Sequence, residues 1–195
     1  MVKHKLLAVA LLATGCASTH RGSEAQGLAV STESLAMIDP SLFPGSGPDV
    51  RRFSCTEMIA ASRSVLFRAF SDEAEFERLY ARGTPAKARI DLAIGGAYEW
   101  LFDGEIGSND CQVLAYIPNE MLAFSWNAPV EQDKSRRQRT WVVVEFDEIE
   151  HGSTQVTLTH LGFGTERHWD ETYEYFQNAW PFVLRRMKDM IESST

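Results

Sequence analysis

The fold is decided by residues 154–192, which read TQVTLTHLGFGTERHWDETYEYFQNAWPFVLRRMKDMIE. At the start of this stretch Val156, Leu158 and His160 alternate with polar residues, which is the period of a strand with one buried face. The period then changes to that of a helix, with large apolar residues at Trp169, Tyr173, Phe176, Trp180, Leu184, Met187 and Ile191. The stretch therefore predicts a strand followed by one long amphipathic helix.

The same two periods recur upstream. Residues 51–58 alternate and predict a strand. Two short helices should follow, capped by Ser62 and Ser71, because serine oxygens accept hydrogen bonds from the free N–H groups of a first turn. Five more alternating stretches, separated by turn signals, are centred on residues 88–92, 98–102, 113–115, 122–126 and 142–146. The prediction is an α+β fold, in which a curved antiparallel sheet of about seven strands wraps around the C-terminal helix.

Five short motifs follow one another along this part of the chain. They are Ile59–Ser62, Ile94–Gly96 with Tyr98, Val113–Pro118, Thr154–Phe163 and Tyr175–Leu184. In this order they resemble the SRPBCC superfamily, which has the START-like helix-grip fold, and in particular its bacterial branch named after the activator of the heat-shock-protein-90 ATPase. The resemblance runs over residues 50–192 and implies a deep, mainly apolar cavity between sheet and helix. Members of the superfamily bind lipids, sterols, hormones or polyketides, and some are enzymes, but this branch has no shared catalytic motif.

The N-terminus has the pattern of an export signal. Lys3 and Lys5 precede an apolar run that is too short to span a bilayer, which needs about 20 residues. The run ends at Ala13-Thr14-Gly15-Cys16, which resembles the lipobox of bacterial lipoproteins, although that pattern prefers Leu where Ala13 stands. The resemblance implies cleavage before Cys16 and a diacylglyceryl group on its sulfur. An ordinary cleaved signal or a buried N-terminal helix is the alternative.

Three segments follow from this interpretation. They are a signal peptide over 1–15, a flexible tether over 16–49 and one folded START-like domain over 50–195. The tether is rich in Ser, Gly and Pro, a composition that favours an extended chain. Ala17, which follows the cysteine, implies delivery to the periplasmic face of the outer membrane if the bacterium has two membranes. A domain exported to the cell envelope would not meet the cytosolic chaperone after which the family is named.

The composition excludes several classes of function. The 195 residues carry a net charge of −8, and an acidic domain is a poor binder of nucleic acid, because phosphates need clustered Lys and Arg. Three cysteines are too few for a disulfide scaffold and lack the spacing of a zinc site. His168 and Glu171 are suitably spaced on a helix, but two metal ligands without a third are common by chance. We therefore expect no nucleic acid, no metal and no cofactor.

Eleven residues on predicted inward faces are candidates for the wall of a ligand cavity. They are Tyr98, Trp100, Phe102, Phe124, Trp126, Val144, Phe146, Leu158, His160, Tyr173 and Trp180. Aromatic surfaces with a few polar tips are typical of ligand sites, but the same residues would also make an ordinary core. His160 is the candidate for catalysis, because histidine titrates near neutrality and can act as a general base. Ligand contact and plain packing are its alternatives.

Two further groups have an open role. Cys55 and Cys111 would pair in an oxidising envelope only if their α-carbons come within about 7 Å. A predicted hairpin loop carries the basic run Lys134, Arg136, Arg137 and Arg139, with Trp141 beside it. This loop is either solvated or a contact surface for phospholipid headgroups, an anionic ligand or a protein partner.

Three functions are compatible with these residues. The first is a lipid-anchored envelope protein, held in the membrane through Cys16, that binds or carries a small apolar ligand in its cavity. The second is an enzyme of the same cavity, a cyclase or hydrolase with His160 as its base. The third is an envelope protein-interaction module that uses Trp141 and the basic loop. The first is preferred, and an enzyme is less expected, because the sequence contains no recognisable catalytic set.

Overall fold

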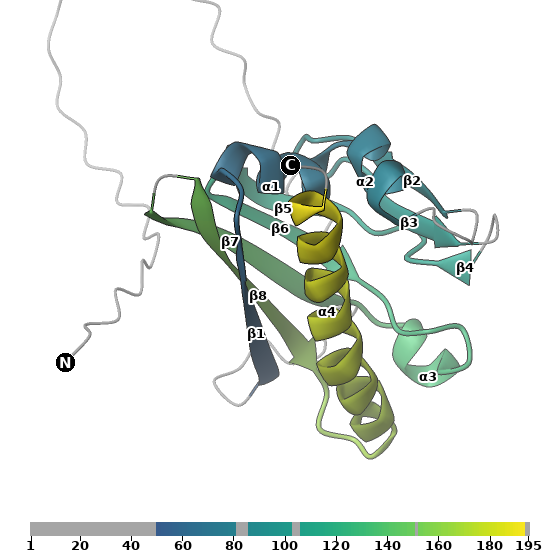
Figure 1. Cartoon of the computed structure of the whole chain (residues 1–195). Helices are drawn as coiled ribbons and strands as arrows, with labels where there is room; N and C mark the ends of the chain where they lie inside the picture. Colours follow the sequence, from purple (N-terminus) through teal and green to yellow (C-terminus); the bar gives the residue numbers. More distant parts are fainter. Residues whose placement is uncertain (1–49, 81–85, 103–105, 151, 194–195) are drawn as a thin grey trace, which may run out of the picture. The chain divides into compact units, whose positions relative to one another are not determined.

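Five antiparallel strands make the main sheet, in the spatial order β1-β8-β7-β6-β5 (Figure 1). Their bounds are β1 Arg51–Ile59, β5 Val113–Ile117, β6 Met121–Trp126, β7 Thr140–Glu150 and β8 Ser153–Phe163. The structure is a computed structural model that describes residues 50–80, 86–102, 106–150 and 152–193. The predicted signal peptide and tether, with Cys16, lie outside the described residues. β1 pairs along its whole length with β8, so that the first and last strands of the domain are neighbours.

A smaller sheet adjoins the β5 edge of the main one. It consists of β2 Ala86–Ile90, β3 Tyr98–Phe102 and β4 Ile106–Gly107. The contacts that join the sheets include a bridge between Ala97 and Gln112 and a hydrogen bond of 2.8 Å from the Tyr98 N–H to the Cys111 carbonyl. Val113 also exchanges backbone hydrogen bonds with Gly95 and Gly96, just before β3. The predicted curved antiparallel sheet is confirmed, and the two-residue β4 is the strand that the sequence did not indicate.

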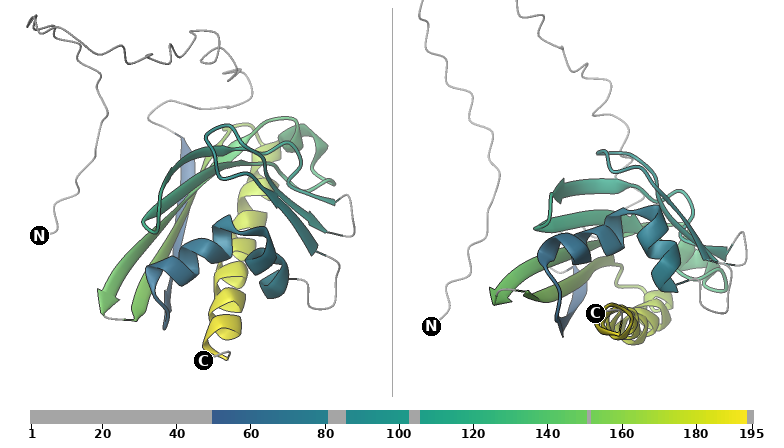
Figure 2. Two further views of the ribbon diagram at one scale, coloured as in Figure 1. Left: turned by 90° about the horizontal axis from the view of Figure 1, so that it is seen from above. Right: turned by 45° about the horizontal axis from the view of Figure 1, so that its top comes forward.

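The predicted C-terminal helix is confirmed as α4, His168–Glu192, with Pro181 inside it. Figure 2 shows α4 on the concave side of the sheet, where the strands curve around it. Its buried residues Trp180, Leu184 and Met187 recur at helical spacing. They share one core with the inward residues of the main sheet, which are Leu122, Phe124, Val142, Val144, Phe146, Val156 and Leu158. Among the described residues, no helix is both long enough and apolar enough to cross a bilayer.

Shorter helices complete the domain. They are α1 Arg63–Ser71, α2 Glu73–Tyr80 and α3 Asp133–Arg136. The first two follow β1 as predicted, and α1 packs the rings of Phe67 and Phe70 edge-on against Phe146 of β7. The third lies where the sequence predicted only a polar loop. This difference matters because α3 carries part of the site described below.

The cap of α2 is Asp72 and not the predicted Ser71. Asp72 Oδ1 accepts a hydrogen bond of 3.0 Å from the backbone N–H of Glu75, whereas Ser71 is the last residue of α1. Ser62 precedes α1 as predicted, but its hydroxyl contacts Ser64 Oγ at 3.0 Å and makes no cap bond. A carboxylate serves well at this position because its negative charge also complements the dipole at the start of α2.

Replacing Asp72 with alanine is expected to lower the free energy of unfolding by about 1 kcal/mol, because the Glu75 N–H loses its acceptor. The matched control is Ser71→Ala, one residue earlier, which should change that free energy by less than about 0.5 kcal/mol. Urea denaturation of both variants measures the difference. Equal losses would contradict the assignment of Asp72 as the cap.

Candidate ligand-binding cleft

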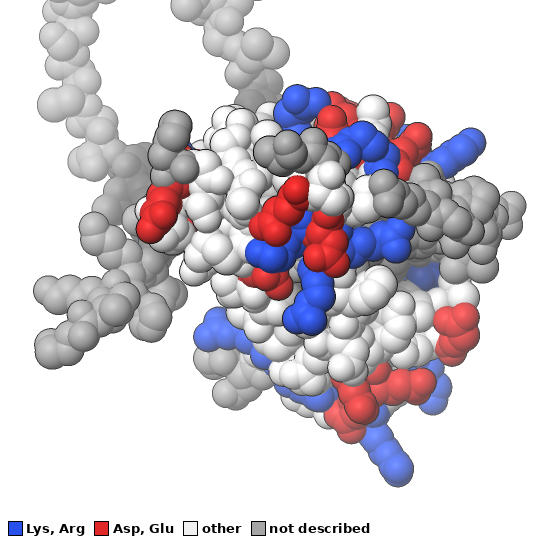
Figure 3. All heavy atoms as spheres, in the orientation of Figure 1, with Lys and Arg blue, Asp and Glu red and all other residues white. Residues whose placement is uncertain are grey.

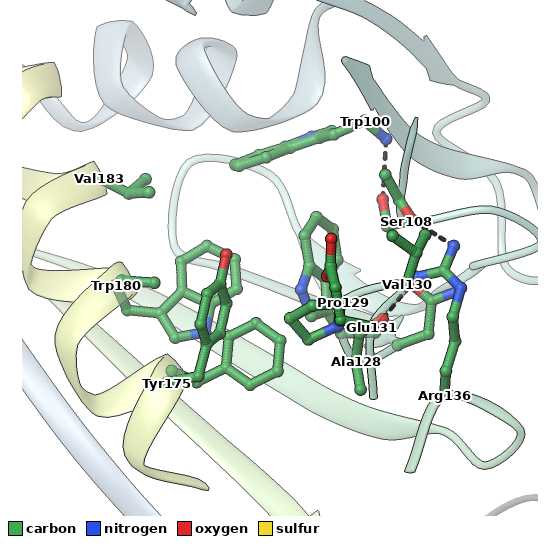
Figure 4. Close-up of a pocket in the computed structure, with 15 residues that line it drawn as sticks. Trp100, Ser108, Ala128, Pro129, Val130, Glu131, Arg136, Tyr175, Trp180 and Val183 are labelled. Carbon is green, nitrogen blue, oxygen red and sulfur yellow. Dashed lines mark hydrogen bonds between the residues drawn. The ribbon is translucent and has the colours of Figure 1, made fainter. Parts of the chain in front are cut away.

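A cleft of about 330 Å³ lies between α4, β3 and the segment that links β6 to α3 (Figure 4). It opens to solvent on one side, and its wall is mostly apolar. The aromatic residues in the wall are Trp100, Trp126, Tyr175, Phe176 and Trp180. This volume falls at the lower end of the range of about 300–1,000 Å³ that is usual for small-molecule sites. The geometry suits a small ligand that buries apolar surface.

Three tryptophans from three separate elements form one side of the cleft. Trp100 lies in β3, Trp126 ends β6 and Trp180 lies on α4. The ring centroids of Trp126 are 5.2 Å from those of Trp100 and 5.3 Å from those of Trp180, and the rings meet edge-on or tilted. Because all three side chains are buried and hold one another in place, this wall exists before any ligand arrives. A preformed wall reduces the ordering cost of binding.

One charged side chain is built into the same cleft. Arg136, at the end of α3, donates hydrogen bonds to the carbonyl oxygens of Ala128 and Gly107, the latter at 2.7 Å. Its guanidinium thereby ties the segment after β6 to the end of β4. The pKa of Arg136 is lowered from its ordinary value, mainly because of burial. The guanidinium is therefore partly desolvated. Glu131 also lines the cleft but is exposed to solvent.

Two buried polar side chains also line the cleft. Ser108 Oγ accepts the backbone N–H of Trp100 at 2.8 Å, and a hydroxyl that accepts in this way can still donate its own proton. Asn127 donates from Nδ2 to the Asn109 carbonyl at 3.1 Å. Its Oδ1 is buried and has no hydrogen-bond partner within the described part of the chain. A buried acceptor without a partner is costly, so this region can bind a donor from a ligand or from water.

His160 lies outside the cleft wall, in a closed chain of hydrogen bonds. Its Nδ1 accepts the indole N–H of Trp180 at 2.9 Å, which places the ring proton on Nε2, and Nε2 donates to Thr140 Oγ1 at 2.7 Å. The Thr140 hydroxyl donates in turn to the Trp126 carbonyl at 3.1 Å. Burial lowers the pKa of His160 well below 6.5, so the ring is neutral. Since both nitrogens are engaged within the protein, this geometry favours packing over general-base catalysis.

The other predicted cavity residues lie elsewhere. Of the ten whose side chains the structure describes, only the three tryptophans line the cleft. Those buried in the core are Tyr98, Phe124, Val144, Phe146, Leu158 and His160. Tyr98 stacks on Phe124 with centroids 4.0 Å apart and donates its hydroxyl proton to the Phe70 carbonyl at 2.8 Å. Tyr173 is half-buried and donates to the Arg52 carbonyl, and the side chain of Phe102 lies outside the described residues.

Sequence reasoning missed the polar residues of the cleft and one side of α4. Ser108 was not among the predicted cavity residues, and the loop that carries Arg136 was left as either solvated or a contact surface. Tyr175, Ala179 and Val183 all line the cleft and are spaced four residues apart. That spacing is a helical stripe of its own, beside the larger stripe through Phe176 and Trp180, and it was the signal available in the sequence.

Neither disulfide nor metal chemistry is assembled in the residues that the structure describes. Cys55 and Cys111 are both free, so the disulfide that the sequence left open does not form. Burial raises the pKa of Cys55 to about 11 and that of Cys111 to about 12, which keeps both thiols protonated and unreactive. No three His, Cys, Asp or Glu side chains within the described ranges gather around a common point, and His168 and Glu171 gain no third ligand there.

The basic run, which the sequence left as either solvated or a contact surface, is only partly solvated. Arg136 reaches into the cleft wall, and Arg139 donates to the Arg136 carbonyl at 3.1 Å. Arg137 is exposed and pairs with Asp133 at 2.6 Å. Figure 3 shows acidic and basic side chains interspersed on the face in view.

Trp141, which the sequence placed at the surface beside the basic run, is half-buried. Its ring covers Gly162 of β8, where an added Cβ would come within 2.8 Å of the indole. Gly162 also has a φ of 93°, a conformation that favours glycine. A ring lying over a strand glycine in this way serves packing, so Trp141 offers less free surface than the third hypothesis needs.

These features define a class of protein: a helix-grip domain whose sheet holds a long C-terminal helix and leaves a small aromatic cleft beside it. The family model for the "Activator of Hsp90 ATPase homolog 1-like protein" matches residues 60–192, and the chain belongs to this family. The resemblance seen in the sequence is therefore confirmed. No curated protein matches the chain.

Solved structures agree with this fold. A protein from Mesorhizobium loti has a TM-score of 0.61 and 21% identity, over 74% of this chain and 99% of that one. A protein from Rhodobacter sphaeroides has a TM-score of 0.60 and 19% identity, over 76% and 97%. An HSP90 activator from Plasmodium falciparum has a TM-score of 0.51 and 25% identity, over 66% of this chain and 86% of that one.

Proposed function

We propose that this protein is a lipid-anchored protein of the cell envelope that binds a small, mainly apolar ligand in the cleft beside α4. The observation that carries the proposal is the cleft itself, with its preformed tryptophan wall and a volume of about 330 Å³. Ligand sites are commonly apolar hollows with a few placed polar groups, and here those groups are Ser108, Asn127 and Arg136. The cleft is open to solvent, whereas the family resemblance implied a deep cavity between sheet and helix.

The proposed location rests on the sequence alone. The lipobox-like stretch before Cys16 would direct diacylglyceryl attachment, and two or three acyl chains anchor a protein stably where one chain is marginal. This location argues against giving this chain the role of HSP90 activator that is named for the Plasmodium falciparum protein, because an envelope protein would not meet a cytosolic partner. The enzyme alternative is weakened by the closed hydrogen bonds of His160.

A protein partner is the second candidate function, on a different surface from the one first considered. Tyr175 at the cleft is 48% exposed, and Phe182, seven residues further along α4, is 66% exposed. Large apolar side chains at such spacing on one helix are typical of contact surfaces. Phe182 lies outside the cleft wall, so Phe182→Ala should abolish partner binding without changing ligand binding.

Native mass spectrometry tests the ligand proposal. The full-length Cys16→Ser variant, exported but not acylated, is purified without detergent. We expect a mass excess from one small molecule that is released on denaturation. The matched control adds Ala179→Trp, which fills the cleft from α4 and should remove the excess. A bare protein mass, combined with no uptake of an added apolar probe, would contradict the proposal.

A further inference from the structure

We infer that the ligand of this cleft is an amphipathic carboxylate whose head group binds Arg136 and Ser108 while its apolar part lies against the tryptophan wall. The inference rests on the proposed function and names the chemical class of its ligand. Figure 4 shows Arg136 and Ser108 at one end of the cleft, with Trp180 and Val183 at the other. The cleft is thus polarised along its length, as an amphipathic ligand requires.

The charge on Arg136 is the first argument. Within the described residues the hydrogen bonds of its guanidinium go to carbonyl and amide oxygens, those of Ala128, Gly107 and Asn109. The carboxylate of Glu131 acts on it electrostatically but forms no ion pair with it in this part of the chain. Carbonyl dipoles compensate a positive charge less completely than an ion does. A guanidinium offers five N–H donors in a planar fork, and these contacts leave at least one of them, that of Nε, for a ligand oxygen. A carboxylate binds such a donor more strongly than a neutral oxygen does, because the hydrogen bond is then assisted by charge on both sides.

Ser108 supplies a second donor in the same wall. Its Oγ already accepts the Trp100 N–H, so the hydroxyl proton is the part left for a ligand. Ser108 follows directly on Gly107, whose carbonyl binds the Arg136 guanidinium, and the two donors therefore lie close together. Two converging donors and a partly buried positive charge favour an anionic group over a neutral or cationic one.

Glu131 is the opposing charge, and its exposure decides the balance. Its carboxylate faces water, where repulsion of a ligand anion is screened by the high dielectric constant. Arg136 is partly desolvated, so its attraction acts at a lower effective dielectric constant. For an anionic ligand, the attraction to Arg136 therefore exceeds the repulsion from Glu131. For a cationic ligand, the repulsion from Arg136 exceeds the attraction to Glu131.

The test compares three probes that share one chain: decanoate, decanol and decyltrimethylammonium. Binding to the full-length, non-acylated Cys16→Ser protein is followed by tryptophan fluorescence, because three tryptophans line the cleft, and by calorimetry. We expect decanoate to bind more tightly than the other two. Arg136→Gln should weaken decanoate about tenfold or more, the effect of losing one charge-assisted hydrogen bond, and should weaken decanol much less, because a neutral hydroxyl loses only a weaker hydrogen bond.

Further variants keep the test decisive if Arg136→Gln disturbs the loops that Arg136 ties together. Arg136→Lys retains the charge and should recover part of the decanoate affinity. Glu131→Gln removes the opposing charge and should strengthen decanoate binding without affecting decanol. In each variant, decanol binding that is largely retained reports an intact cleft.

Two results would overturn the inference while leaving the proposed function in place. One is equal affinity for decanoate and decanol in the unmutated cleft. The other is tighter binding of decyltrimethylammonium, which would assign the head group to Glu131. If none of the three probes binds, and native mass spectrometry also finds no ligand, the proposed function itself fails.

Discussion

Trp180→Ala is expected to lower the free energy of unfolding by about 3–5 kcal/mol, the usual cost of removing a large buried ring. Trp180 is 1% exposed and packs against both Trp100 and Trp126. Its indole N–H also donates to His160 Nδ1, so the substitution leaves that nitrogen buried without a donor. Urea denaturation followed by circular dichroism measures the loss.

Trp180→Phe separates the two contributions. It keeps most of the ring packing and removes the donor, so its cost should be about 1–3 kcal/mol. The same variant leaves the cleft lined by an aromatic ring, so ligand binding should persist in it. A loss below about 1 kcal/mol for Trp180→Ala would contradict the central packing role assigned to this residue.

Stability is also expected to fall as the pH is lowered through the neutral range, because of His160. The folded-state pKa of His160 is depressed by burial well below 6.5, whereas in the unfolded chain it titrates normally. The unfolded state therefore binds a proton that the folded state does not. The stabilising contribution is complete above pH 6.5 and is lost as the pH falls below that value, by about 1.4 kcal/mol per pH unit at the steepest.

Denaturant unfolding at about pH 7.5 and about pH 5.5 checks this expectation, with an expected difference of about 1.4 kcal/mol. The window stays above the range in which carboxylates contribute, such as Glu192, whose pKa is lowered mainly by the Ala60 backbone N–H. His160→Gln cannot titrate, and its stability should vary less across the same window. An identical pH dependence in both proteins would show that His160 is not the group responsible.

The fold was predictable because its signals are local. The alternation of Val156, Leu158 and His160 determines which face of β8 is buried, and neighbouring residues suffice to show it. The period of α4 is equally clear over 25 residues, even with Pro181 inside. Local signals fail where two helices are separated by a single residue, as α1 and α2 are by Asp72. There Ser71 and Asp72 are equally plausible caps by residue type.

The site was predictable only in its apolar part. Trp100, Trp126 and Trp180 could be assigned to inward faces by period alone. Arg136 could not, because its place depends on the Gly107 carbonyl, 29 positions earlier in the chain, and on a turn that brings the two together. In sequence it stands among other basic residues, and such runs are usually solvated. A hydrogen bond to a backbone carbonyl far away in the chain produces no periodic pattern in the sequence.

The pairing of β1 with β8 determines when this domain can form during protein synthesis. Arg51 lies opposite Phe163, and Ile59 opposite Thr154, so the first strand has no neighbour until the last one has left the ribosome. Contacts between such distant residues form late and slow folding. The nascent chain therefore stays without its closing strand for most of translation. In the cell-envelope location proposed above this would be an advantage, because a chain whose sheet is not yet closed can still pass through a secretion channel.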